Sequence, residues 1–221
     1  MKTKTITVAG AFLVIAASPA CAGDGLYLGL GAGLDFQNDV SLHELDAPFA
    51  NGQFSADVGG IVAGTVGFKF PVFPVRLELE SSYSFHSVSS VQSLNGASTS
   101  ATGHSDIQAE IANAIYDFPV APGWNFYAGA GIGDGHVNST AAPSGTGYQV
   151  ADLDHGAMIW QLIGGASFEV TPDVDLFVDY RFRDAHARDT VLVDPVGSVL
   201  SGITTDNVVV VGMRFYPGFW E

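Results

Sequence analysis

Basic residues, cysteine and long apolar runs are all scarce in this 221-residue chain, and each scarcity excludes a class of protein. Eight Lys and Arg stand against 23 Asp and Glu, for a formal net charge of −15, which argues against nucleic-acid partners because they need basic patches. The single cysteine, Cys21, excludes a disulfide framework. The apolar run at 8–17 is well short of the roughly 20 residues that a membrane-spanning helix needs.

The N-terminal segment has the order of a secretory signal: Lys2 and Lys4, the apolar run, and then Ala20, Cys21 and Ala22. We therefore expect residues 1–22 to be a signal peptide that is removed, and 23–221 to form a single domain. Cleavage there would remove the only cysteine. A lipoprotein with Cys21 at its new N-terminus is the alternative, but no aliphatic residue stands three places before Cys21.

Side-chain polarity alternates with a period of two through residues 74–86, PVRLELESSYSFH. One face carries Val75, Leu77, Leu79, Tyr83 and Phe85, and the other carries Arg76, Glu78, Glu80, Ser82, Ser84 and His86, with Ser81 the only lapse. Similar strands are predicted at 25–36, 56–70, 105–118, 124–136, 155–170, 174–183 and 206–216. Apolarity that is spread by alternation, with a mean hydropathy of +0.27, is typical of a membrane barrel.

The connections between these strands differ in length. Three short, proline-containing turns at 71–74, 119–123 and 171–173 alternate with four longer segments at 36–55, 87–104, 137–154 and 187–203. Bacterial outer-membrane barrels have short periplasmic turns and long extracellular loops. The sequence therefore predicts an all-β fold, an eight-stranded antiparallel up-and-down transmembrane β-barrel with both termini periplasmic. A soluble sandwich or lipocalin is the alternative, but it does not explain the segregation of the connections.

Energetics decide which face of each strand looks inward. A Lys or Arg side chain that faces lipid near the bilayer midplane costs about 2–4 kcal/mol, so the charged faces should line the interior. We expect an interior charge network of Lys69, Arg76, Glu78, Glu80, Asp175, Asp179, Arg181, Arg183 and Arg214. In the strand at 105–118, Asn113 and Asp117 share one face and Glu110 takes the other, which predicts a bulge between them.

Few residues are candidates for a metal-binding or catalytic site. The histidines at 43, 86, 104, 136, 155 and 186 lie in the long connections or beside them, where a metal site or a pH-responsive rim would be possible. Exposed strand ends also tolerate polar residues, and we favour that interpretation, so no metal site and no cofactor is predicted. His86 with Ser87 and Ser89, or His186 with Asp184 and Asp189, are the nearest approaches to a hydrolase triad. Neither has a recognisable spacing, and we predict that the protein is not an enzyme.

The apolar connection at 187–203 has two interpretations. Exposed apolar residues usually mark contact sites, but the flanking strands could instead extend past the membrane as a hairpin. We favour the hairpin.

Several stretches resemble the small eight-stranded outer-membrane barrel family that includes OmpA, OmpX and Opa-like proteins and Omp25-type surface antigens. The matching stretches are YLGLGAG at 27–33, RLELE at 76–80, NAIYDF at 113–118, YAGAGIG at 127–133, QLIGG at 161–165, DYRF at 179–182 and VGMRF at 211–215. The resemblance implies a membrane-anchoring, surface-interacting or immune-recognised protein of the outer membrane. It also implies an assembly signal in the last strand, to which Gly212 and Phe215 conform, although Pro217 stands where a final aromatic residue is expected.

We therefore expect an outer-membrane structural or surface-interaction protein, a small monomeric barrel plugged by its own side chains. Its expected partners are membrane lipid, lipopolysaccharide, the outer-membrane assembly machinery and an extracellular ligand at 36–55, 87–104, 137–154 and 187–203. A narrow porin-like channel is the alternative, although an eight-stranded barrel is only wide enough for its own side chains. A lipid-modifying enzyme is a third possibility.

Overall fold

The computed structural model describes residues 25–38, 40–44, 51–92, 98–144, 151–187, 191–193, 198–201 and 203–217. The predicted signal peptide at 1–22 lies outside these residues. No helix in the described part of the chain is long and apolar enough to cross a membrane.

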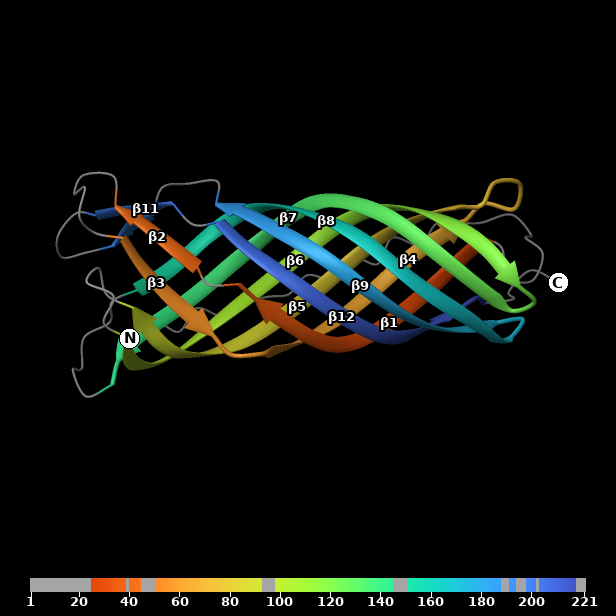
Figure 1. Ribbon diagram of the computed structural model, residues 1–221. Coiled ribbons are helices and arrows are strands. Elements are labelled where there is room, and N and C mark those ends of the chain that lie inside the picture. Colours follow the sequence, from red (N-terminus) through yellow and green to blue (C-terminus); the bar gives the residue numbers. More distant parts are fainter. Residues whose placement is uncertain are drawn as a thin grey trace.

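Eight long strands form a closed antiparallel barrel (Figure 1). They are β1 (Gly25–Gln37), β4 (Gly59–Lys69), β5 (Val75–Gln92), β6 (Ser98–Ala121), β7 (Trp124–Pro143), β8 (Ala151–Thr171), β9 (Val174–Ala187) and β12 (Ile203–Phe215). Each strand pairs with the next one in this series, and β12 pairs back to β1. The predicted eight-stranded barrel is thereby confirmed.

Short reversals join strands at one end of the barrel, which we call the short-turn end (Figure 1). Only Pro122 and Gly123 separate β6 from β7, and only Pro172 and Asp173 separate β8 from β9. Gly123 has a φ of +76°, in the left-handed region that a residue without a Cβ adopts readily. β1 begins and β12 ends at this same end, so both ends of the barrel sheet lie beside the short turns.

The four long connections contain more strand than the sequence predicted. β5 to β8 run well into the segments 87–104 and 137–154, and four further strands lie in the other two connections: β2 (Val40–Glu44), β3 (Asn51–Ala56), β10 (Val191–Val193) and β11 (Ser198–Ser201). Backbone N–H and C=O groups need partners whatever the side chains are, so segments without the alternating pattern still form ladders.

These four strands extend the sheet beyond the barrel at the far end, opposite the short turns (Figure 1). β3 pairs with β5, β2 with β3, β11 with β2 and β10 with β11. The apolar connection does form a hairpin, between β10 and β11, but it is separate from β9 and β12 rather than an extension of them.

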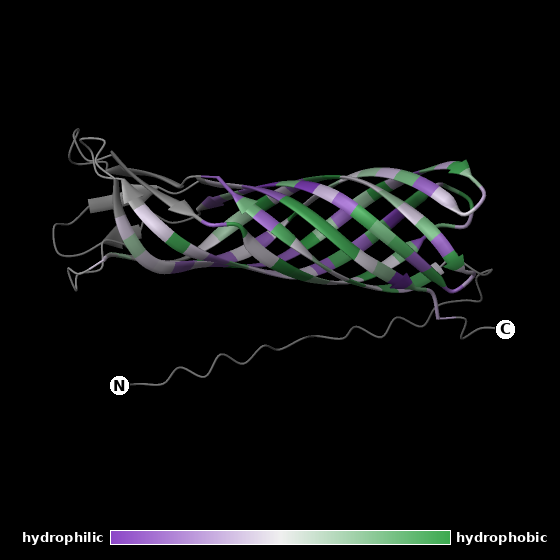
Figure 2. Ribbon diagram, turned by 60° about the horizontal axis from the view of Figure 1, so that its bottom comes forward, coloured by the Kyte–Doolittle hydropathy of each residue, from purple (hydrophilic) through white to green (hydrophobic). Residues whose placement is uncertain are grey.

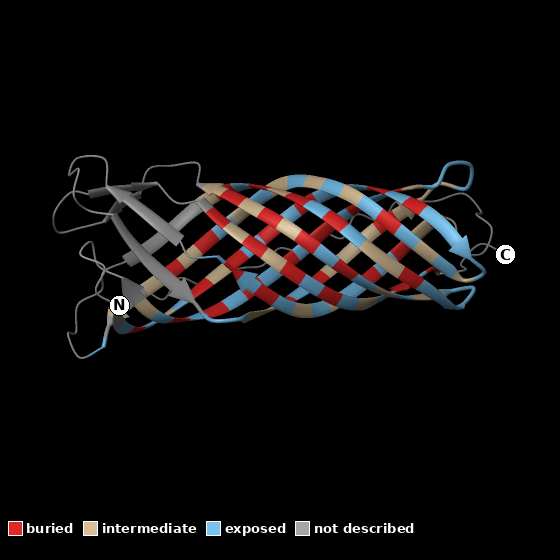
Figure 3. Ribbon diagram, viewed as in Figure 1, coloured by how far each residue is buried: buried red, intermediate tan, exposed pale blue. Residues whose placement is uncertain are grey.

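Polarity is inverted relative to a soluble protein. Hydrophobic and hydrophilic residues alternate along the barrel strands, and buried and exposed residues alternate with them (Figures 2 and 3). Leu30 is 68% exposed and Leu79 is 63% exposed, whereas Arg76 is 1% exposed and Arg183 is fully buried. The apolar side chains therefore cover the outside of the barrel, and the charged ones are enclosed.

The predicted bulge in β6 is wrong. The register between β6 and β7 is continuous from Ala101 to Pro119, so Glu110 points outward while Asn113 and Asp117 point inward. Across the β5–β6 ladder Glu110 faces Ser81, the lapse in the alternating pattern of β5, and Ser81 Oγ donates a 2.7 Å hydrogen bond to Glu110 Oε1. The two exceptions to the alternating pattern therefore satisfy each other, and no bulge is needed.

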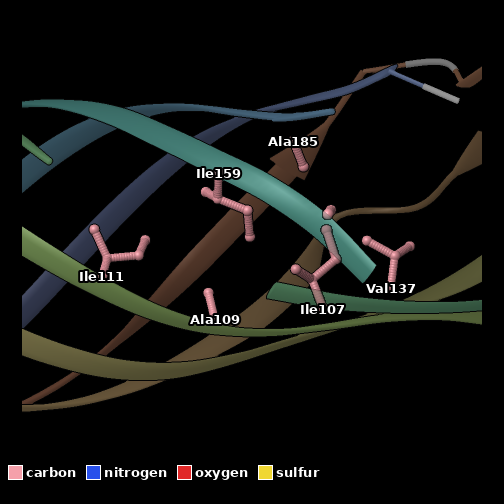
Figure 4. Close-up of a cluster of buried hydrophobic side chains, with 7 residues drawn as sticks. Ile107, Ala109, Ile111, Val137, Ile159 and Ala185 are labelled. Carbon is pink, nitrogen blue, oxygen red and sulfur yellow. The ribbon is translucent and has the colours of Figure 1, made fainter. Parts of the chain in front are cut away.

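Part of the interior is apolar. An apolar cluster lies along β6 to β9 on one side of the interior, in the half away from the short turns (Figure 4); its members are Ile107, Ala109, Ile111, Val137, Ala157, Ile159 and Ala185. A second cluster of Ile61, Val208 and Val210 comes from β4 and β12 and packs against Phe177. The charged side chains therefore occupy only part of the interior.

Candidate functional site: the barrel interior

Near the short-turn end, an ion-pair cluster is centred on Arg76 of β5. Arg76 Nη1 lies 2.7 Å from Glu78 Oε1, and Arg76 Nε lies 2.9 and 3.1 Å from the two carboxylate oxygens of Asp117 on β6. Tyr27 of β1 donates its hydroxyl hydrogen to Glu78. Strands β1, β5 and β6 are thereby joined through the Arg76 guanidinium.

Aromatic rings hold a second guanidinium beside this cluster. Arg214 of β12 lies over Phe177 at 4.4 Å and over Tyr127 at 5.0 Å, and its Nε is 3.8 Å from Glu78 Oε1. Arg76 also lies 5.0 Å from the Tyr127 ring centre. Cation–π contact is strongest when it is desolvated, so these buried rings help to stabilise two like charges in a small space.

A second polar cluster is centred on the Glu80 carboxylate, halfway along β5. Its Oε1 lies 2.7 Å from Arg181 Nη1 and 3.1 Å from Arg183 Nη2, both on β9. Its Oε2 accepts hydrogen bonds of 3.0 Å from Asn113 Nδ2 and 3.1 Å from Gln161 Nε2. Both carboxylate oxygens are thus fully used, which is what an enclosed charge requires.

The partners of Glu80 are connected to one another. Gln161 Nε2 donates to Asn113 Oδ1 at 2.8 Å, and Gln161 Oε1 accepts from Arg183 Nη2 at 3.2 Å. Arg181 Nε donates to Asp179 Oδ1 at 2.9 Å. The result is a network that crosses the barrel from β5 to β9.

The structure brings seven of the nine predicted interior charges into these two clusters: Arg76, Glu78, Glu80, Asp179, Arg181, Arg183 and Arg214. The other two lie closer to the short turns and are half-buried. Asp175 accepts a 3.0 Å hydrogen bond from the Tyr216 hydroxyl, and Lys69 stands opposite Arg76 in the β4–β5 ladder.

Sequence reasoning left five members of the clusters out of the predicted network: Tyr27, Asn113, Asp117, Tyr127 and Gln161. For Asn113 and Asp117 a usable signal was their shared parity on β6, which the outward Glu110 obscured. For Gln161 the signal was an isolated amide in the apolar run MIWQLIGG.

The histidines whose side chains the structure describes do not gather at one place. Among the described residues, no group of three His, Cys, Asp or Glu side chains could hold a metal ion. His186 Nδ1 lies 2.6 Å from Asp184 Oδ1, and His104 Nε2 lies 3.9 Å from Asp106 Oδ2, in two separate pairs toward the far end. The side chains of His43 and His155 lie outside the described part of the chain.

Of the two approaches to a hydrolase triad, the one at His86 is not assembled. His86 is 4% exposed and points into the barrel, whereas Ser87 and Ser89 point outward from the same strand. His186 does pair with Asp184, but Asp189 lies outside the described residues.

The two residues of the predicted assembly signal have distinct structural positions. Phe215 is 46% exposed on the outer surface. A Cβ at Gly212 would meet the Leu30 carbonyl oxygen and lie 2.5 Å from Phe177 Cζ, so the glycine allows this ring to approach the strand. Gly212 therefore has a packing role within the barrel, whatever the assembly machinery recognises.

Comparison with known proteins identifies the family to which this barrel belongs. Residues 6–213 match the model of the outer membrane protein beta-barrel domain. The chain belongs to the outer membrane protein beta-barrel domain family. It is an outer-membrane protein, and its exposed apolar belt faces lipid.

Two solved barrels of the outer membrane have the same fold. The chain is 17% identical to the Neisserial surface protein A, with 86% of this chain and 96% of that one covered and a TM-score of 0.50. It is 12% identical to OprG from Pseudomonas aeruginosa, with 87% and 96% covered and a TM-score of 0.54. No curated protein sequence matches the chain. These low identities establish the fold only.

Aromatic pairs bound the lipid-facing belt of this family member at both ends. Beside the short turns, Tyr116 packs on Phe118 and Trp124 on Phe168, with ring centres 4.8 and 4.9 Å apart. Toward the far end, the pairs are Trp160 with Phe182 and Tyr83 with Phe85. Aromatic rings of this kind favour the membrane–water interface. Tyr216, which also lies beside the short turns, instead points inward and packs on Tyr27.

Proposed function

We propose that this protein is a structural and surface-interaction component of the outer membrane. It is a monomeric barrel that is plugged by its own side chains and presents its four long connections to the cell exterior. Both termini are periplasmic, and residues 1–22 are a signal peptide that is removed after export. The last strand, with Gly212 and Phe215, is the segment that the assembly machinery recognises.

The observation that carries the plug is the Glu80 network. Its donors come from β6, β8 and β9, so the network crosses the interior from one wall to the opposite one. An eight-stranded barrel encloses little more than the volume of its own side chains. Because Glu80, Gln161 and Arg183 are at most 2% exposed, the interior is filled at this level.

The charge of the long connections supports a cationic ligand at the exterior. The segments 36–55, 87–104, 137–154 and 187–203 contain seven acidic residues, Asp39, Glu44, Asp46, Asp152, Asp154, Asp189 and Asp194, against the single base Arg188. Complementary charge steers encounter and favours partners of opposite sign. Lipopolysaccharide and membrane lipid are the partners of the apolar belt.

Planar-bilayer recording tests the plug. We expect no unit current from the wild-type protein. We expect the double variant Glu80→Ala/Arg183→Ala, which removes the network without leaving one of these two charges unpaired, to raise conductance. The matched control Asp57→Ala alters an exposed acidic side chain outside the barrel interior. A steady, well-resolved current from the wild-type protein would favour the narrow-channel alternative.

Orientation is tested on intact cells. An epitope inserted at 93–97 should be labelled by antibody, and an epitope added after Glu221 should be labelled only after the outer membrane is permeabilised. Labelling of the C-terminal epitope on intact cells would contradict periplasmic termini. The same cells should show the protein in the outer-membrane fraction, with a mobility shift on boiling.

We propose no catalytic activity. Purified protein incubated with lipopolysaccharide should leave its acyl pattern unchanged. An altered pattern that His186→Ala abolishes would favour the lipid-modifying alternative and identify the His186–Asp184 pair as its centre.

A further inference from the structure

A third group of titratable side chains lies in the half of the interior away from the short turns. Asp35 of β1 and Asp206 of β12 are fully buried, and His86 of β5 is 4% exposed. Gln37 is Asp206's partner in the β1–β12 ladder and is 9% exposed. We call Asp35, His86 and Asp206 the acid–histidine cluster. It has no part in the Arg76 and Glu80 clusters.

Gly59 of β4 makes the approach of Asp35 and His86 possible. Asp35 stands opposite Gly59 in the β1–β4 ladder, and the His86 ring lies over the same glycine from β5. A Cβ at Gly59 would lie 2.7 Å from His86 Cγ, so any other residue would displace the ring. His86 Nε2 is thereby held 3.6 Å from Asp35 Oδ1.

The cluster lacks the hydrogen bonds that enclosed ionised groups require. Among the described residues, no hydrogen bond of 3.5 Å or less reaches the four carboxylate oxygens of Asp35 and Asp206 or the ring nitrogens of His86, whose contact with Asp35 is the 3.6 Å ion pair. The Gln37 amide and the hydroxyls of Ser82 and Ser84 also have no hydrogen-bond partner among the described residues. These groups contrast with Glu80, whose two oxygens are both used.

Charge around the cluster is also unbalanced. Asp35 and Asp184 repel a negative charge on Asp206, while Arg183 and His86 attract it. Arg183 is Asp206's partner in the β9–β12 ladder, but its guanidinium donates to Glu80 and Gln161. Among the described residues, His86 is therefore the cation beside these acids that no carboxylate of the Arg76 or Glu80 cluster binds. On the β6–β8 side the interior is the apolar cluster (Figure 4).

Two enclosed carboxylates beside a single imidazole carry more negative charge than it can balance, so the doubly ionised pair is penalised. Uptake of a proton removes the excess negative charge and supplies the missing donor between the acids. A protonated carboxyl group is both a donor and an acceptor, whereas a carboxylate only accepts.

We propose that Asp35, His86 and Asp206 form a proton-binding site at the far end of the barrel interior, and that the bound proton keeps β1, β5 and β12 packed together there. This inference goes beyond the proposed plug, because it makes the closure of the outward end depend on pH while the Glu80 network stays closed.

The test is the urea midpoint of unfolding of the full mature chain in detergent, measured from about pH 5.5 to about pH 8.5. An unfolded aspartate is ionised throughout this range, so the folded state binds more protons and its stability falls as pH rises. We expect the wild-type midpoint to decrease across the range and this decrease to be lost in Asp35→Asn/Asp206→Asn. The matched control Asp57→Asn changes an exposed carboxylate and should follow the wild type.

Parallel curves for the wild type and the double variant would overturn the proposal. Infrared spectroscopy provides a second readout at conditions where all variants are folded, because a protonated carboxyl group absorbs separately from a carboxylate. The wild type should show a protonated-carboxyl band at neutral pH that Asp206→Asn removes and Asp57→Asn retains. Absence of that band from the wild type would equally reject the site. Neither result bears on the conductance test of the plug.

Discussion

Arg183 Nη2 lies 3.1 Å from Glu80 Oε1, although 103 residues separate them in the chain. Their strands, β9 and β5, are four positions apart in a ring of eight, so this contact joins opposite walls of the barrel. Because both side chains are almost fully buried, the pair can exist only where further donors and acceptors complete it.

Removing one base from the Glu80 network should be strongly destabilising. Arg181→Leu deletes the 2.7 Å contact to Glu80 and the 2.9 Å contact to Asp179, which leaves buried carboxylates without their main counter-charge. We expect a loss of about 3–5 kcal/mol in the free energy of unfolding, measured by urea titration in detergent micelles. An unchanged midpoint would show that the network adds nothing to barrel stability.

Truncating a lipid-facing residue should be mild. Leu77 is 49% exposed on the outer surface, so lipid or detergent can fill the space that Leu77→Ala leaves. We expect a change of about 0.5 kcal/mol or less, in the range of ordinary surface substitutions. The matched interior variant Ile111→Ala should lose about 2–5 kcal/mol, because Ile111 is 2% exposed within the apolar cluster. The reverse order would mean that inside and outside have been exchanged.

Glycines of one barrel should differ sharply in their tolerance of alanine. A Cβ at Gly133 would lie 2.7 Å from the backbone Cα of Ile111, whereas a Cβ at Gly164 would meet nothing within 4 Å. We expect Gly133→Ala to destabilise by about 1–3 kcal/mol through overpacking, and Gly164→Ala to be neutral within about 0.5 kcal/mol. Heat-modified gel mobility of the two variants compares them directly, and equal losses would contradict the close approach of β6 and β7.

The outward pair Ser81 and Glu110 should be coupled. Ser81→Ala removes the 2.7 Å hydrogen bond to Glu110 Oε1 at the lipid-facing surface. We expect Ser81→Ala to lower the free energy of unfolding by about 1 kcal/mol. In a double-mutant cycle, the same substitution should cost little in the Glu110→Ala background, because the acceptor is already gone. Strictly additive losses would show that the two side chains do not interact in the membrane.

Much of the barrel could be predicted because the sequence of a single strand shows which residues lie on its inner face and which on its outer face. In β5 the charges at 76, 78 and 80 alternate with apolar residues at 75, 77 and 79, and only one orientation keeps the charges out of lipid. The strands within the polar connections, among them β2 and β3, were not predicted, because their ladders depend on backbone pairing that polar side chains do not signal.

The interior was harder to predict than the wall. That Glu80 and Arg181 face inward follows from parity, but the carboxylate that each guanidinium contacts depends on the register between strands distant in sequence. Glu110 was misinterpreted for the same reason, since its partner Ser81 lies on another strand.

Sequence alone determined the number of barrel strands, their alternation and the inverted polarity, because each follows from the period of side chains along a single strand and the cost of charge in lipid. Only the tertiary structure decided that Arg183 reaches Glu80 and that Gly59 leaves room for His86 beside Asp35. The reason is closure: the ring places β5 opposite β9 and two strands from β1, and no local pattern encodes which side chains then share the enclosed volume.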